Sequence, residues 1–206
     1  MSLLKGTVSL TRYHIVDEYQ VLSDQTLTAR LKANSFRDIE ATADEESVGW
    51  VGILDPFNTD LETQHFKFGD TIGLALRVDR RHVSSNMITR YLNLAEADIK
   101  KQSGNKPSVK ERRQLKDRIR IDLITRVPIT TKVTEICWFT DRKEIWLGAT
   151  GVKERERFEE LWRKTFSLGL IMKIPYILAG HLLPAQVPAS NLEQAKPAAF
   201  FSGGTR

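Results

Sequence analysis

Closely spaced lysines and arginines are the chain's most concentrated chemical feature, and the chemistry open to them is anion binding. Positions 100–126 hold ten basic and three acidic residues, a net charge of +7. The rest of the chain carries −2, so the whole-chain charge of +5 is a local property. Positive charge at about one residue per helical turn can follow a phosphate backbone and displace its condensed counterions. The pattern favours a local phosphate-facing surface.

Three of these cations share one side of a predicted helix. On a helical wheel Arg113, Lys116 and Arg120 fall within roughly 60° of each other, beside a stripe that includes Leu115 and Ile119. The alternative is a solvated helix face whose long side chains cover apolar surface. Helix-turn-helix, zinc-finger and RNA-binding aromatic motifs are missing, so any nucleic-acid contact should be to phosphates and independent of base sequence.

Other residue types give weaker evidence for a catalytic or metal-binding function. The sequence lacks a phosphate-binding loop and a nucleophile elbow. Cys137 lies in an apolar strand pattern and is expected to act as a small hydrophobe. The histidines are scattered without the spacing of a zinc site, and we expect no metal or cofactor; they are His14, His65, His82 and His181.

An acidic stretch provides an alternative chemistry, a metal-dependent nuclease that holds Mg²⁺. Its candidate ligands are Asp38, Glu40, Asp44, Glu45, Glu46, Asp60 and Glu62. A solvated acidic loop explains the same residues, and we favour that interpretation.

The elements that must position these residues follow from hydrophobic periodicity. Strands are expected at 7–16, 48–51, 66–68, 71–78, 133–139 and 144–149, with 170–178 a last strand or extended cover. Helices are expected at 24–36, 84–102, 108–126 and 152–167. This order lacks strict βαβ alternation, so it predicts an α+β fold, a mainly antiparallel sheet with long helices packed on it.

The two middle helices should form a protrusion over about 84–128. A break at 103–107 separates them, and Ser108 with Glu111 forms a capping-box pattern at the start of the second helix. We expect one α+β region over 1–181 and a flexible Pro/Ala/Gly-rich tail over 182–206.

Composition points to the cytoplasm. A single cysteine fits a reducing compartment, the longest apolar stretch is too short to span a membrane, and the N-terminus does not read as a secretory signal.

Taken in order, several short strings resemble the RdgC family of recombination-associated bacterial DNA-binding proteins over about residues 4–178. They are Gly49-Trp50-Val51, the strand 71–78 followed by Val83-Ser84, Ser108-Val109-Lys110-Glu111, Trp138-Phe139-Thr140-Asp141, Ile145-Trp146-Leu147 and the charged helix 153–164. Family chains continue past the point matching Tyr176, so we expect a version shortened at the C-terminus. Ile129 stands where the family has an aromatic residue.

The resemblance implies a non-enzymatic protein that forms ring-shaped homodimers around duplex DNA and restrains recombinase-driven strand exchange. It implies double-stranded DNA as partner, with recombination proteins as further candidates, and a nucleoid-associated place in the cytoplasm. The implied DNA-contact residues are Lys100, Lys101, Lys106, Lys110, Arg112, Arg113, Lys116, Arg120, Arg77, Arg80 and Arg81. The competing hypotheses are a protein-interaction module of the same fold without DNA binding, and the metal-dependent nuclease.

Overall fold

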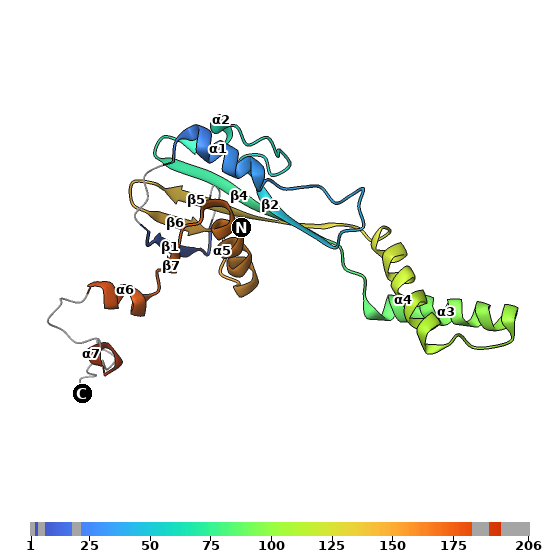
Figure 1. Cartoon of the computed structure of the whole chain (residues 1–206). Coiled ribbons are helices and arrows are strands. Elements are labelled where there is room, and N and C mark those ends of the chain that lie inside the picture. The colour runs from blue at the N-terminus through green and yellow to red at the C-terminus, as the bar shows by residue number, and fades with distance from the viewer. Residues whose placement is uncertain (1–2, 4–6, 18–21, 183–189, 195–206) are drawn as a thin grey trace, which may run out of the picture.

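The chain forms an α+β fold, seen in a computed structural model that describes residues 3, 7–17, 22–182 and 190–194 (Figure 1). The strands are β1 Thr11–Ile15, β2 Glu46–Gly52, β3 Lys67–Phe68, β4 Thr71–Arg80, β5 Thr130–Phe139, β6 Glu144–Leu147 and β7 Leu170–Met172. The helices are α1 Asp24–Ala33, α2 Thr63–Phe66, α3 Ser85–Ser103, α4 Val109–Ile124, α5 Val152–Phe166, α6 Pro175–Leu182 and α7 Ser190–Glu193.

The strands form one antiparallel sheet in the order β2-β4-β5-β6-β1-β7, with β3 paired to β4. The predicted hairpins β3–β4 and β5–β6 are both confirmed. The longest pairing joins β4 to β5, from Thr71 opposite Phe139 to Arg80 opposite Thr130. Since α3 and α4 connect Arg80 to Thr130, the far end of this strand pair carries both helices.

The core lies where α5 packs on the sheet. Trp138 and Trp162 are almost completely buried and meet edge to face, with ring centroids 4.9 Å apart. Such geometry adds to the stabilisation from burial itself. Trp50 satisfies its indole N–H by donating to the Thr165 hydroxyl at 2.8 Å. Leu27 and Leu31 of α1 join the same core cluster, so α1 and α5 both pack into the core on the sheet.

Helices α3 and α4, here called the arm, project away from the sheet and from α1 and α5 (Figure 1). The Ser84 hydroxyl accepts from the Met87 amide at the start of α3, and the predicted capping box of Ser108 with Glu111 is present at the start of α4. Gly104 ends α3 in the left-handed conformation that favours glycine. Local hydrogen bonds therefore set both ends of the turn between the helices.

The arm buries less apolar surface than the periodicity predicts. Leu92, Leu123 and Ile124 are buried, whereas Tyr91 is 43% exposed and Val109 is 89% exposed. Two helices packed on each other alone can cover only one narrow stripe of each, since the sheet does not lie behind them. Ile88, Ile99, Leu115 and Ile119 are partly buried between the helices, and Met87, Tyr91, Leu94, Val109 and Ile121 are exposed.

Three other expectations need correction. Helix α1 ends at Ala33 rather than 36, because the Asn34 carbonyl and Phe36 amide instead bond to Trp50 of β2. Helix α2 was not expected. Strand β7 ends at Met172, and Pro175 begins α6, where proline's missing N–H costs nothing in the first helical turn.

The predicted flexible tail falls mostly outside the described residues. Within 182–206 the structure describes the end of α6 and residues 190–194, which include the short helix α7.

Candidate nucleic-acid interface

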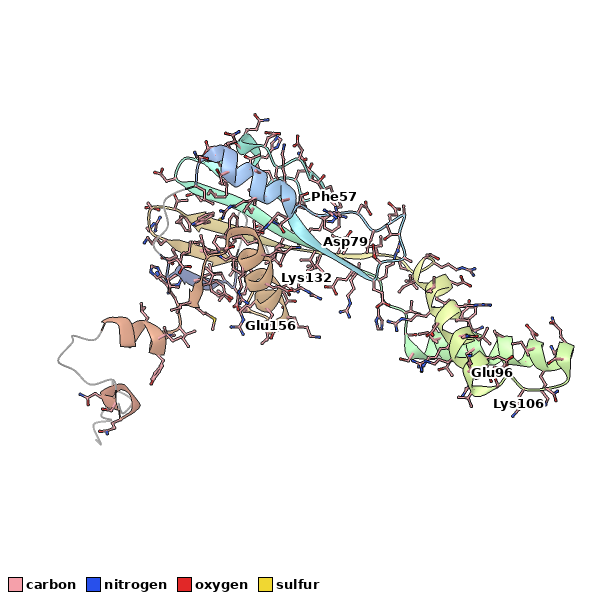
Figure 2. All side chains as sticks on the ribbon, viewed as in Figure 1. Phe57, Asp79, Glu96, Lys106, Lys132 and Glu156 are labelled. Atoms are coloured by element: carbon pink, nitrogen blue, oxygen red, sulfur yellow. The ribbon has the colours of Figure 1, made fainter. Side chains whose placement is uncertain are left out.

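The arm presents its cations to solvent. Figure 2 shows side chains radiating from both helices, with Glu96 and Lys106 labelled on the arm. All eight arm residues predicted to contact DNA are exposed: Lys100, Lys101, Lys106, Lys110, Arg112, Arg113, Lys116 and Arg120. The structure therefore brings these cations together on one projecting element and leaves them accessible to an anion.

Three of these cations already contact carboxylates. The Arg112 Nε atom lies 2.5 Å from a Glu96 oxygen across the two helices, and Lys101 lies 3.7 Å from Asp98. Arg120 reaches off the arm, and its Nη2 donates to Glu45 at 2.6 Å. Exposed pairs of this kind contribute little to stability and open easily, so they reduce the local potential without blocking the surface.

The other five arm cations have no ion pair within the described residues: Lys100, Lys106, Lys110, Arg113 and Lys116. Their side chains extend from the end of α3, the intervening loop and the first half of α4. Charge left unneutralised over this length is what electrostatic contact with a polyanion requires.

A cleft of about 360 Å³ lies between the start of α3 and the middle of α4. Arg113, Lys116 and Arg120 line it from α4, at a spacing that places them on one helix face. Asp117 is the acidic residue in this lining. Ser85, Ile88 and Thr89 form the opposite wall. Three cations against one carboxylate make the cleft suited to an anionic group.

Of the three predicted residues on and after β4, two have structural partners. Arg77 is 8% exposed, and its guanidinium donates to both Asp79 oxygens, at 3.0 and 2.6 Å. It also lies over the rings of Phe36 and Phe57, at 4.1 and 4.9 Å from their centroids; Figure 2 labels Phe57 and Asp79 on the sheet body. Because Arg77 is buried and its guanidinium already pairs with the Asp79 carboxylate, it is poorly placed to contact a phosphate.

Arg81 is also turned inward. It is 5% exposed, and its guanidinium donates to the carbonyl oxygens of Thr42 and Glu40, at 2.5 and 2.9 Å. Its amide donates to the Glu45 carbonyl at 2.9 Å. Arg81 therefore anchors the acidic loop beside the arm, whereas Arg80 at the end of β4 is exposed. We leave Arg77 and Arg81 out of the interface and keep Arg80.

Four of the seven acidic residues proposed for the alternative metal site form ion pairs with basic side chains. Glu45 pairs with Arg120 and Glu46 with Arg157, while Asp60 and Glu62 both contact Lys32. Nowhere in the described residues do three or more His, Cys, Asp or Glu side chains gather as a metal ion would require. Glu45 and Arg120 are 75 positions apart in the sequence, and no local sequence pattern predicts that they pair.

Cys137 is half-buried on β5. Burial, together with the nearby Glu135 carboxylate, raises the pKa of its thiol. The thiol therefore stays protonated near neutral pH, which agrees with the expectation of a small hydrophobe rather than a nucleophile.

Comparison with known proteins adds one match. A family model described as "RdgC: Putative exonuclease, RdgC" matches residues 9–178. No curated protein matches the chain. No helix in the part of the chain that the structure describes is long and apolar enough to cross a membrane.

Proposed function

Because the chain belongs to the RdgC family, we propose that it is a non-enzymatic, sequence-independent duplex DNA-binding protein that acts in recombination, in the nucleoid of the cytoplasm. The role in recombination is what the sequence resemblance to the RdgC family implies. Membership of that family is supported by the match over residues 9–178, which are 170 of the 206 positions.

The observation that carries the proposal is the arm itself. It holds the excess positive charge of the chain and keeps its predicted DNA-contact cations exposed. It also projects away from the sheet (Figure 1). Contact to phosphates by such side chains carries no base information, so binding is independent of sequence. Its free energy comes largely from the release of counterions and falls steeply with salt.

Homodimerisation belongs to the same proposal. The arm exposes apolar side chains beside its charges: Met87, Tyr91, Leu94, Val109 and Ile121. Exposed apolar groups on a projecting element favour a protein contact, and a second copy of this chain fits a family of homodimers. The mass in solution, measured with and without duplex DNA, tests this; a monomer under both conditions contradicts it.

The experiment that tests DNA binding measures duplex affinity against salt for the native chain and for Arg113→Ala/Lys116→Ala. If both side chains contact phosphates, the plot of log affinity against log salt becomes shallower in the variant. Its slope decreases in magnitude by about 1.8, because each phosphate contributes about 0.9. Lys164→Ala on α5 is the control, since Lys164 is exposed and lies off the arm. An unchanged slope rejects Arg113 and Lys116 as contacts. Absence of binding at low salt favours the protein-interaction module instead.

The exonuclease named in the family description is the second candidate. It predicts Mg²⁺-dependent loss of nucleotides from linear duplex DNA, abolished by Asp44→Ala. The side chain of Asp44 accepts from the Thr42 hydroxyl at 2.9 Å and lies in the acidic loop beside the arm. Intact DNA after incubation with Mg²⁺ leaves the non-enzymatic proposal standing.

A further inference from the structure

The contact between Glu45 and Arg120 joins the sheet body to the arm. Both side chains are about half exposed, at 52% and 54%, and the Arg120 Nη2 atom lies 2.6 Å from the carboxylate. Glu45 immediately precedes β2, and its carbonyl accepts the Arg81 amide. Buried Arg81 thus fixes the backbone of Glu45, and the carboxylate is held where Arg120 can reach it.

Arg120 is also part of the cleft between α3 and α4. There it lies on the same helix face as Arg113 and Lys116, which have no ion pair within the described residues. Of the three cations in the cleft, Arg120 is therefore the one that an internal anion already occupies. Asp117 lowers the net charge of the lining but leaves it positive.

A guanidinium recognises carboxylates and phosphates through the same planar fork of N–H donors. We infer that the cleft is a phosphate-binding site for the DNA backbone, and that Glu45 is an internal competitor that occupies Arg120 until DNA displaces it. This inference rests on the proposed DNA-binding function.

Displacement changes the ion balance in a measurable way. When Arg120 moves from Glu45 to a DNA phosphate, the phosphate releases a counterion, but the ion pair that must break is itself weakened by salt. Competition by Glu45 therefore eases as salt rises, and Arg120 adds less than one full phosphate to the salt dependence of binding. If Glu45 is replaced by glutamine, no carboxylate competes, and the contact contributes up to a full phosphate to the slope.

The adjacent residue offers a matched control. Glu46 carries the same charge but pairs with Arg157 of α5, at 2.5 Å, and not with the arm. Glu46→Gln changes the net charge of the chain by the same amount as Glu45→Gln. It separates competition for Arg120 from a general change in charge.

The test measures binding of a short mixed-sequence duplex at a series of salt concentrations. The variants are Glu45→Gln, Glu46→Gln, Arg120→Ala and Glu45→Gln/Arg120→Ala, each checked for native thermal unfolding. We expect Glu45→Gln to tighten binding several-fold at low salt and to steepen the slope by up to about 0.9. Glu46→Gln should leave the slope unchanged, and Glu45→Gln should have little effect on the slope once Arg120 is alanine.

Two results overturn the inference while leaving the proposed function intact. One is duplex binding in which Glu45→Gln matches Glu46→Gln in affinity and slope. The other is a slope that Glu45→Gln steepens equally in the presence and absence of Arg120. If the native chain does not bind duplex DNA even at low salt, both the inference and the proposed function fail.

Discussion

Replacing Gly49 with alanine tests how the sheet body holds the loop that carries Glu45. Strand β2 is crossed closely at Gly49 by the segment that follows α1. A Cβ atom there lies 2.4 Å from both the Phe36 nitrogen and its Cα, and 2.6 Å from the Ser35 carbonyl carbon. These are backbone atoms, and ordinary contact begins near 3.4 Å. The segment must therefore move by about 1 Å, a displacement that a close-packed interior resists.

That displacement strains two hydrogen bonds. The Phe36 amide donates to the Trp50 carbonyl at 3.0 Å, and the Trp50 amide donates to the Asn34 carbonyl at 3.0 Å. Overpacking of a buried site costs about 1–3 kcal/mol. At about 2–4 °C per kcal/mol for a chain of this size, Gly49→Ala should lower Tm by roughly 2–12 °C.

Gly52→Ala is the matched control on the same strand. The nearest atom to its added Cβ is the Asp55 carbonyl oxygen at 3.4 Å, an ordinary contact. Its stability should stay within about 0.5 kcal/mol of the native chain. Thermal unfolding followed by circular dichroism compares the two. Equal Tm values for the two alanine variants would refute the close-approach argument.

Two further predictions concern the arm and the start of β6. Ser108→Ala removes the hydroxyl that accepts from the Glu111 amide and should cost about 0.5–2 kcal/mol locally. Hydrogen exchange should quicken in the first turn of α4 with little change in the core, and unchanged exchange there contradicts it. At the start of β6, burial tends to raise the pKa of Glu144, but hydrogen bonds from Lys173 and Trp146 outweigh it and lower the pKa below 4.5. The stabilisation is therefore present above about pH 4.5 and lost as pH falls through the lowered value, since the unfolded state binds the proton first. In urea unfolding, Lys173→Met should destabilise the chain most above that pH, and a loss independent of pH would contradict the assignment.

Local signals predicted much of the fold. The capping box at Ser108, the hairpin at Gly69 and the stop near Pro128 depend on residues a few positions apart, and all three elements form close to the expected places. The antiparallel α+β class followed from the order of the elements. Helix α6 could not be separated from a strand in the same way, because a short apolar run has no clear period.

For the candidate site too, the features that depend on nearby residues could be predicted, and those that depend on distant segments could not. Charge density alone singled out the arm cations, because exposed lysines and arginines on a helix need no distant partner to be accessible. In the sequence, Arg77 and Arg81 could not be distinguished from the arm cations. In the structure, both are buried and form hydrogen bonds with other protein groups. Their neighbours come from loops many positions away.

Residue types and local spacing predict one concentrated basic segment and two capped helices within it. The three-dimensional fold adds that these helices project away from the sheet, that Arg120 contacts Glu45, and that Arg77 and Arg81 are buried. The two kinds of information differ because the interactions behind them act over different distances along the chain. Capping and periodicity act within a few residues, whereas burial and ion pairing depend on which distant segments the β4–β5 pairing brings beside each other.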